Sequence, residues 1–271
     1  MRRRSLSVLY PLVITVEFKG LDVLQAHIPD SRAPGALWQV PLWIAVVFVL
    51  TTLFFVAADR GFAEWMPDGE IVVLALGFLI LSRFFSQRHH YRRKYGERAF
   101  AAAFTRFSIP GLGIIMASIA HLAYIAGPGI PGVWWRVWLI ALGYALVLIG
   151  ITLWVRSVLA LGIDNLVMLY VYFPAEGQKN TVSIIGMLRH PIYSAALDIG
   201  FGLALIHANW YALLVALLLP IFYAGWVRLE EEPELMERFP DYAAYRKRVP
   251  AFTPKPSDVP RFARFLLLGR V

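Results

Sequence analysis

An arginine, a histidine and a proline open an apolar stretch of the chain, GMLRHPIYSAALDIGFGLALI, at positions 189–191. Proline is tolerated in the first turn of a helix, so we expect Pro191 to begin a helix that carries Arg189 and His190 at its N-terminal end. Free backbone N–H groups and the helix dipole favour anions there. The three residues therefore predict an anion-receptive corner, although basic residues at a helix end are also ordinary topology signals.

A second cluster of ionisable residues follows the next apolar segment. Six of the eighteen acidic residues lie within 230–241, in the run LEEEPELMERFPDY. Apolar and aromatic residues recur there at helical spacing: Leu235, Phe239, Tyr242, Tyr245 and Val249. Carboxylates beside the arginine–histidine corner suggest a ligand with both charges, such as an amino-acid group with ribose hydroxyls. The alternative is a solvated helix face with an acidic first turn.

The composition indicates what must position these clusters. The chain of 271 residues is 59% hydrophobic and only 16% charged, with a mean hydropathy of +0.61, which is typical of an integral membrane protein. It has no cysteine, which excludes disulfides, thiolate nucleophiles and Cys-ligated metals. A bilayer core requires about 20 apolar residues per helix. About six segments approach this length: 40–58, 70–85, 108–126, 135–155, 192–208 and 210–227.

The positive-inside rule predicts the orientation. If both termini are cytoplasmic, 24 of the 26 basic residues face the cytoplasm, and only Arg60 and Arg136 do not. The predicted fold class is therefore all-α: a polytopic integral membrane helical protein with about six transmembrane helices and with its N- and C-termini in the cytoplasm. The start of the chain predicts a short interfacial helix. The net charge of +8 is explained by topology and anionic lipid, without nucleic acid.

Two further segments allow more than one interpretation. Residues 156–188 are apolar but interrupted by polar residues, and could form a seventh span or a strip at the membrane surface. The charge rule favours the surface strip, because a seventh span would place the basic C-terminal region outside. In the basic stretch 83–98, His89 and His90 would point apart on a helix, so we expect a solvated loop and no metal site.

At these residues the chain resembles the integral membrane methyltransferases of the isoprenylcysteine carboxyl methyltransferase and phospholipid methyltransferase type. That family carries RHPxY, a helical hairpin, EExxL, an aromatic residue, paired tyrosines and a valine–proline. The matching residues are Arg189-His190-Pro191-Ile192-Tyr193, Glu231-Glu232-Pro233-Glu234-Leu235, Phe239, Tyr242, Tyr245 and Val249-Pro250. We expect two parts: 1–130, with the N-terminal helices and the first three spans, and 131–271, with a methyltransferase-like membrane core and a cytoplasmic C-terminal segment.

The resemblance implies S-adenosylmethionine-dependent methyl transfer to a lipophilic acceptor at the cytoplasmic face of a bacterial-type inner membrane. The cofactor would contact His190, Pro191 and Tyr193 on one side. Glu231, together with Glu232, would hold it from the other side. The acceptor would arrive sideways from the bilayer, and a prenylated cysteine, a phospholipid amine and a lipophilic thiol or phenol remain open.

Three residues are catalytic candidates. Arg189 and Arg228 could orient an acceptor; in the family an arginine shortly before the glutamates helps to place the substrate, and Arg228 is shifted from it by one position. Asp198 lies inside the predicted fifth span, where an ionisable side chain is costly and is a functional candidate by default. It could take a proton from a lipid amine, or it could simply pair with an interior group such as His121.

The chain departs from the family pattern at two places. Ser183-Ile184-Ile185 stands where the family usually has a Gly-Pro-Tyr whose tyrosine touches the cofactor, and Pro240 stands where glycine is usual. One cofactor contact is therefore lost or replaced.

Two other functions compete with methyl transfer. A membrane NADPH-dependent reductase of a sterol-like lipid would share a related C-terminal architecture, but the acidic run disfavours it because a nucleotide phosphate calls for arginine and lysine. A non-catalytic membrane scaffold would use the basic stretch 83–98 as its docking surface.

Overall fold

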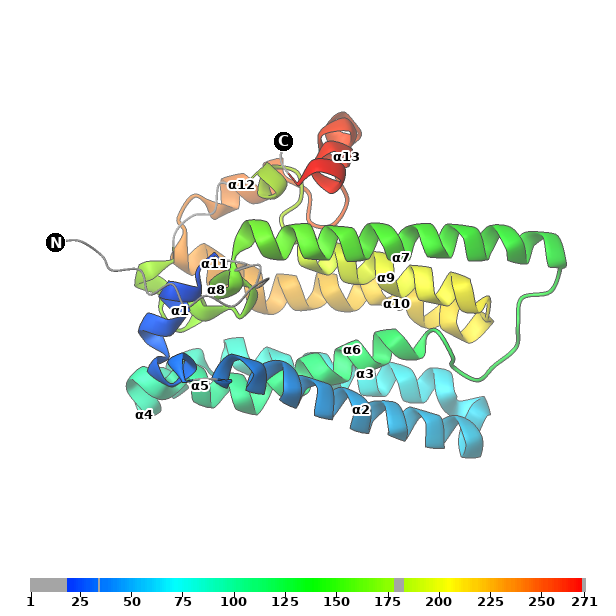
Figure 1. Ribbon diagram of the computed structural model, residues 1–271, viewed down its shortest axis with the longest axis horizontal. Helices are drawn as coiled ribbons and strands as arrows, with labels where there is room; N and C mark the ends of the chain where they lie inside the picture. The colour runs from blue at the N-terminus through cyan, green and yellow to red at the C-terminus, as the bar shows by residue number, and fades with distance from the viewer. Residues whose placement is uncertain (1–18, 34, 178–182, 270–271) are drawn as a thin grey trace, which may run out of the picture.

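The computed structural model describes residues 19–33, 35–177 and 183–269, and every regular element in these ranges is helical (Figure 1). The α-helices are α1 Leu21–His27, α2 Ala36–Phe62, α3 Met66–Ser86, α4 Arg88–Tyr95, α5 Ala99–Ala103, α6 Ile109–His121, α7 Val133–Leu161, α8 Ile163–Leu166, α9 Pro191–His207, α10 Trp210–Trp226, α11 Glu232–Arg238, α12 Tyr242–Arg248 and α13 Val259–Leu268. The 3₁₀ turns are η1 Pro29–Arg32, η2 Ala63–Trp65, η3 Gly96–Arg98, η5 Leu169–Val171, η6 Pro174–Glu176, η7 Ser183–Gly186 and η9 Pro256–Asp258, and two π-helical turns are η4 Phe104–Ser108 and η8 Val227–Glu231.

Four helical stretches of the described chain are long and apolar enough to cross a membrane: Leu37–Ser86, Arg88–His121, Val133–Leu161 and Trp210–Arg238. The first of them contains both α2 and α3, and α9 is a shorter apolar helix. The predicted all-α, polytopic fold is therefore confirmed, and each of the six predicted segments coincides with a helix. The number of six spans and the orientation of the termini stay predictions.

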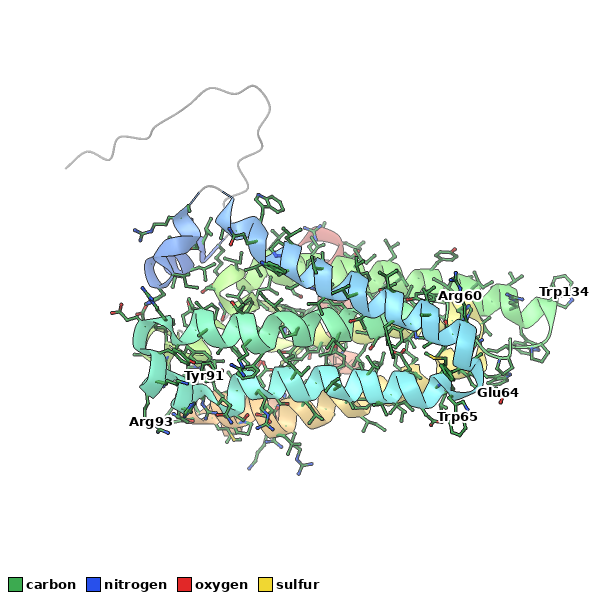
Figure 2. All side chains as sticks on the ribbon, turned by 90° about the horizontal axis from the view of Figure 1, so that it is seen from below. Arg60, Glu64, Trp65, Tyr91, Arg93 and Trp134 are labelled. Carbon is green, nitrogen blue, oxygen red and sulfur yellow. The ribbon has the colours of Figure 1, made fainter. Side chains whose placement is uncertain are left out.

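The long helices form one bundle in two groups (Figure 1). Helices α7, α9 and α10 make one group and α2, α3 and α6 the other, with α3 packed on α10 and α6 on α9. One end of the bundle, here called the turn end, holds the α2–α3 turn and the α9–α10 hairpin. The opposite end, the short-helix end, gathers α1, α4, α5, α8, α11 and α12. Tyr91 and Arg93 mark the short-helix end in Figure 2, and Trp65 and Trp134 mark the turn end.

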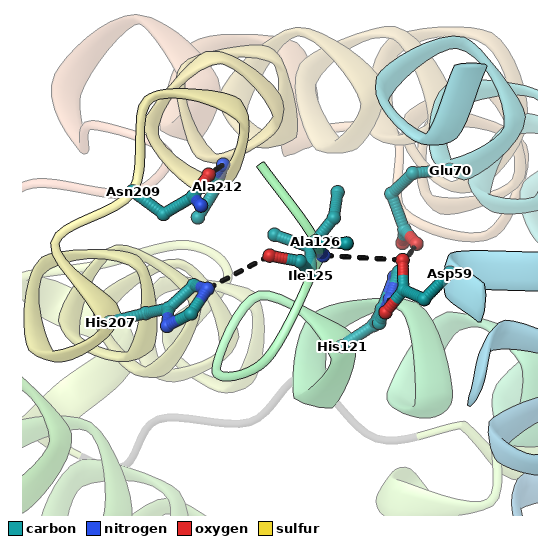
Figure 3. A network of polar contacts seen from close by, with 8 residues as sticks. All are labelled: Asp59, Glu70, His121, Ile125, Ala126, His207, Asn209 and Ala212. Atoms are coloured by element: carbon teal, nitrogen blue, oxygen red, sulfur yellow. Dashed lines mark hydrogen bonds and ion pairs between the residues drawn. The ribbon is translucent and has the colours of Figure 1, made fainter. Parts of the chain in front are cut away.

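A buried polar network holds the second group together at the turn end (Figure 3). His121 contacts Glu70 through Nδ1 and Asp59 through Nε2, the latter at 3.1 Å. Asp59 also accepts a hydrogen bond of 3.2 Å from the backbone N–H of Ala126. Buried charges require such partners. Since both ring nitrogens of His121 face these carboxylates, the pairing of His121 with Asp198 that the sequence left open is not formed.

A polar turn at 207–210 closes the α9–α10 hairpin. The side chain of Asn209 caps α10 by accepting a hydrogen bond of 2.8 Å from the backbone N–H of Tyr211. His207 Nε2 donates to the carbonyl of Ile125 at 2.9 Å (Figure 3). The turn therefore brings the end of α9 directly to the start of α10.

Glycines let α7 and α9 pack with their backbones in close contact. A Cβ atom added to Gly202 of α9 would lie only 2.7 Å from the carbonyl oxygen of Gly143 of α7. One added to Gly150 of α7 would lie 2.8 Å from the carbonyl oxygen of Ala195 of α9. Small residues permit this close approach between membrane helices. The contact fixes α9, whose first turn carries the arginine–histidine corner.

The substitution Gly202→Ala is expected to lower thermal stability, because the new methyl group forces the two backbones apart at a cost of about 1–3 kcal/mol. The melting temperature of the detergent-purified protein measures the effect. Gly225→Ala in α10 is the matched control, since no atom lies within 4 Å of the added Cβ there. Equal melting temperatures for the two variants would contradict the close packing.

The remaining predicted segments have mixed outcomes. Within 156–188, α7 ends at Leu161, and the described residues that follow form only short helical segments, none long enough for a seventh span. Their position at the membrane surface stays a prediction. The basic stretch 83–98, predicted as a loop, instead folds as the end of α3 followed by α4 and η3. Its charges are compatible with a helix because Tyr91 supplies a buried anchor. The helix predicted at the start of the chain lies outside the described residues.

Candidate active site

The two ionisable clusters meet at the short-helix end. Helix α9 begins at Pro191, as expected, with His190 in the N-cap position. Helix α10 runs back along α9 and continues through η8 into α11. Because α9 and α10 form a hairpin, the start of the first helix lies beside the end of the second. The acidic run is thereby placed against the arginine–histidine corner.

Glu232 is the centre of this contact and is only 2% exposed. Its Oε1 accepts a hydrogen bond from Arg189 Nη1, and its Oε2 lies 3.1 Å from Arg246 Nη1 of α12. His190 Nε2 approaches the same carboxylate at 3.7 Å. A buried carboxylate is stable only when compensated in this way, and arginine suits the task because its guanidinium stays charged. Contacts of Glu232 therefore hold the residues just before α9, helix α11 and helix α12 together.

His190 lies between the two clusters and is 4% exposed. Its Nδ1 is 3.5 Å from Glu231 Oε1, and its ring stacks on Tyr193 with centroids 5.7 Å apart. Burial alone would lower the pKa of the imidazole, but the carboxylates of Glu231 and Glu232 outweigh it, and the pKa is raised above its ordinary value of 6.5. The geometry thus favours the imidazolium form.

The chain after α12 closes over the corner. The backbone N–H of Arg189 donates to the carbonyl of Pro250 at 2.9 Å, and that of His190 donates to Ala251 at 3.1 Å. Tyr245 donates its hydroxyl to the carbonyl of Ile185 at 2.7 Å. Burial raises the pKa of Tyr245 to about 12, so the hydroxyl keeps the proton that it donates. These bonds hold the corner in place although the family's usual Gly-Pro-Tyr is absent at 183–185.

An aromatic wall borders the site. Tyr193 stacks on Tyr223 of α10 at 5.4 Å between ring centroids and meets Trp226 edge-on at 5.3 Å. Aromatic ring faces attract positive charge. The wall therefore offers an apolar surface that also suits a cationic ligand.

Several buried polar atoms around the corner lack a hydrogen-bond partner among the described residues: Glu231 Oε2, His190 Nε2, Trp226 Nε1 and Tyr242 OH. An unsatisfied buried polar group is costly, and native structures contain few of them. The set contains one acceptor and several groups that can donate. This set fits a ligand that has an amine or hydroxyl to donate and a carboxylate or ring nitrogen to accept.

Two of the catalytic candidates lie away from this cluster. Arg228 is exposed on η8, and its side chain forms no hydrogen bond or ion pair with the described residues. Asp198 is half-buried on α9, close to Gly150 of α7 and about two helical turns from His190. The structure therefore gathers Arg189, His190, Pro191, Tyr193, Glu231 and Glu232, but not these two residues, whose roles stay predictions.

The sequence alone did not single out Arg246, Tyr223 or Trp226. Arg246 belongs to a basic run that had been explained by topology, and only the turn between α11 and α12 brings it to Glu232. Tyr223 and Trp226 lie in an apolar helix where aromatic residues are ordinary. The available signal was their spacing, since residues three apart share one face of α10.

Comparison with known proteins agrees with the motif. Residues 138–241 match a family model described as phospholipid methyltransferase. The match includes α9, α10 and α11, and it confirms the resemblance to membrane methyltransferases; α4, α12 and α13 lie outside it. No curated protein and no solved structure matches the chain.

Proposed function

We propose that the chain transfers a methyl group from S-adenosylmethionine to a lipid-like acceptor at the cytoplasmic face of a bacterial-type inner membrane. The family match supports a methyltransferase, and the apolar helices support an integral membrane protein. One observation carries the rest: His190 and Glu231, which come from different elements, lie 3.5 Å apart in a buried corner lined with unpartnered polar atoms.

The donor would be held between the start of α9 and the acidic run. Glu231 has a free carboxylate oxygen for an ammonium group or a ribose hydroxyl, and Trp226 and His190 have ring nitrogens without hydrogen-bond partners. Glu232, expected to touch the cofactor, is already engaged by Arg189 and Arg246. We therefore assign Glu232 and Arg189 the task of positioning the helices.

The chain contributes alignment more than covalent chemistry. When bound, S-adenosylmethionine supplies an electrophilic methyl group on a sulfonium. The residues of the corner fix the approach of the nucleophile and exclude water, which are the main requirements of an in-line displacement. A carboxylate acceptor needs no general base. An amine acceptor must lose a proton, and Asp198 on α9 is the candidate to accept it.

Labelling tests this proposal. Membranes containing the protein are incubated with methyl-labelled S-adenosylmethionine, and the lipid extract is separated by chromatography. We expect label in one lipid fraction, and none with the His190→Ala variant. Calorimetry on the detergent-purified protein tests the two alternatives. Binding of NADPH, with no binding of S-adenosylhomocysteine, would instead indicate a reductase. Binding of neither would indicate a scaffold.

A further inference from the structure

A separate cavity of about 290 Å³ lies at the short-helix end, between α4, α11 and the residues around η6. Five of its lining residues are charged. Arg88 and Arg92 come from α4, and Glu234, Glu237 and Arg238 come from α11. Three guanidinium groups therefore face two carboxylates, which leaves the cavity with an excess of positive charge.

Two of the three arginines are fixed by their surroundings. The side chain of Arg88 is 16% exposed, and its Nη1 donates to the carbonyl of Phe85 at 3.1 Å. The side chain of Arg238 is 11% exposed, lies 4.8 Å from the ring centre of Phe239 and donates to Glu234 at 3.1 Å. Held guanidinium groups lose little conformational freedom when they bind a ligand.

The three arginines also have guanidinium groups that are available to bind an anion. Glu237, the partner of Arg88, has a side chain that is 55% exposed and therefore lies at the rim of the cavity. An ion pair whose carboxylate is this exposed contributes less free energy than a fully buried pair, so another anion can replace this carboxylate. Arg92 forms no ion pair with the described residues, and Arg238 Nε is buried without a hydrogen-bond partner.

We infer that this cavity binds a phosphate-bearing ligand through Arg88, Arg92 and Arg238. The planar fork of a guanidinium matches two phosphate oxygens, and these charge-assisted hydrogen bonds are among the strong ones in proteins. Two of the three arginines belong to α4, which lies outside the stretch that matches the methyltransferase family. The site therefore combines α4, which lies outside the matched stretch, with Arg238 of α11, which lies within it. It does not depend on the proposed methyl transfer.

The phosphate can belong to a lipid headgroup or to a soluble compound, and two probes distinguish them. Binding of inorganic phosphate and of dihexanoyl phosphatidic acid to the full-length, detergent-purified protein is measured by calorimetry. Binding of both probes indicates a soluble phosphate ligand, and binding of the lipid alone indicates a headgroup. Arg92→Gln should weaken binding about tenfold, which corresponds to about 1.4 kcal/mol, since it removes a charge-assisted hydrogen bond.

Arg93→Gln is the matched control. Arg93 is the exposed neighbour on α4 and does not line this cavity, although it borders the adjacent surface hollow with His89 and Arg92. Arg92 makes no ion pair in the described structure, so its replacement should leave the melting temperature unchanged. The inference is overturned if neither probe binds, or if Arg93→Gln weakens binding as much as Arg92→Gln, since the effect would then be surface charge alone.

Discussion

Glu231→Gln is expected to abolish measurable binding of S-adenosylhomocysteine, with a loss of about 100-fold or more in affinity. The carboxylate of Glu231 has one oxygen without a hydrogen-bond partner, and its other oxygen lies 3.5 Å from His190 Nδ1. A neutral amide at this position removes the charged acceptor for the ligand and also the ion pair with His190. His190→Ala should have a similar effect, because it removes the other side of the corner. Calorimetry on the detergent-purified protein measures both variants.

The neighbouring Glu230→Gln serves as the control for this experiment. Glu230 lies on the same π-turn as Glu231, is half-buried and makes no ion pair with His190. Its replacement should leave the affinity for S-adenosylhomocysteine within about twofold of the wild-type value. If Glu231→Gln and His190→Ala both bind like the wild type, the site assignment is wrong.

Glu232→Gln is expected to destabilise the fold by about 3–5 kcal/mol, because it leaves Arg189 and Arg246 around a buried group that has lost its charge. The free energy of unfolding in detergent measures the loss. The control is Glu237→Gln: this carboxylate is also paired with an arginine, but its side chain is 55% exposed, so we expect a change below about 1 kcal/mol.

The same experiment separates two roles of Glu232. A positioning residue affects stability first, and ligand affinity only as a consequence of altered helix packing. A variant that melts like the wild type but no longer binds S-adenosylhomocysteine would show that Glu232 is a direct ligand. Such a result would contradict the positioning role proposed for it.

Most of the fold follows from hydrophobicity. Runs of apolar residues such as 40–58 and 135–155 can only be helices if they cross a bilayer, since every backbone group must be paired within the segment. The structure extends these two to α2 and α7. The secondary structure of the stretch 83–98 was harder to predict. Its many charges indicate exposure to water, but they do not distinguish a loop from a solvated helix.

The sequence predicts the part of the candidate site that depends on the hairpin between α9 and α10. Pro191 sets the start of a helix, and the predicted segments 192–208 and 210–227 leave room only for a tight turn between them. The residues before α9 must therefore lie near those after α10. The contact between Arg246 and Glu232 depends on the direction in which α12 leaves α11, and no local pattern encodes that direction. The sequence therefore predicted the corner but not what compensates its buried charge.

The polar network at the turn end was also beyond the sequence. Asp59 and Glu70 lie near the ends of α2 and α3, where acidic residues normally face water. Only the tertiary packing of α6 between these helices brings His121 to both carboxylates. A buried pairing of this kind depends on three helices at once, which is why the position of His121 alone could not reveal it.

A structure of the protein with bound S-adenosylhomocysteine tests the central claim most directly. The account predicts that the ligand lies at the short-helix end, with His190 on one side and Glu231 on the other, and with the aromatic wall of Tyr193, Tyr223 and Trp226 beside it. A ligand found at the turn end, or one that touches neither His190 nor Glu231, would contradict the account.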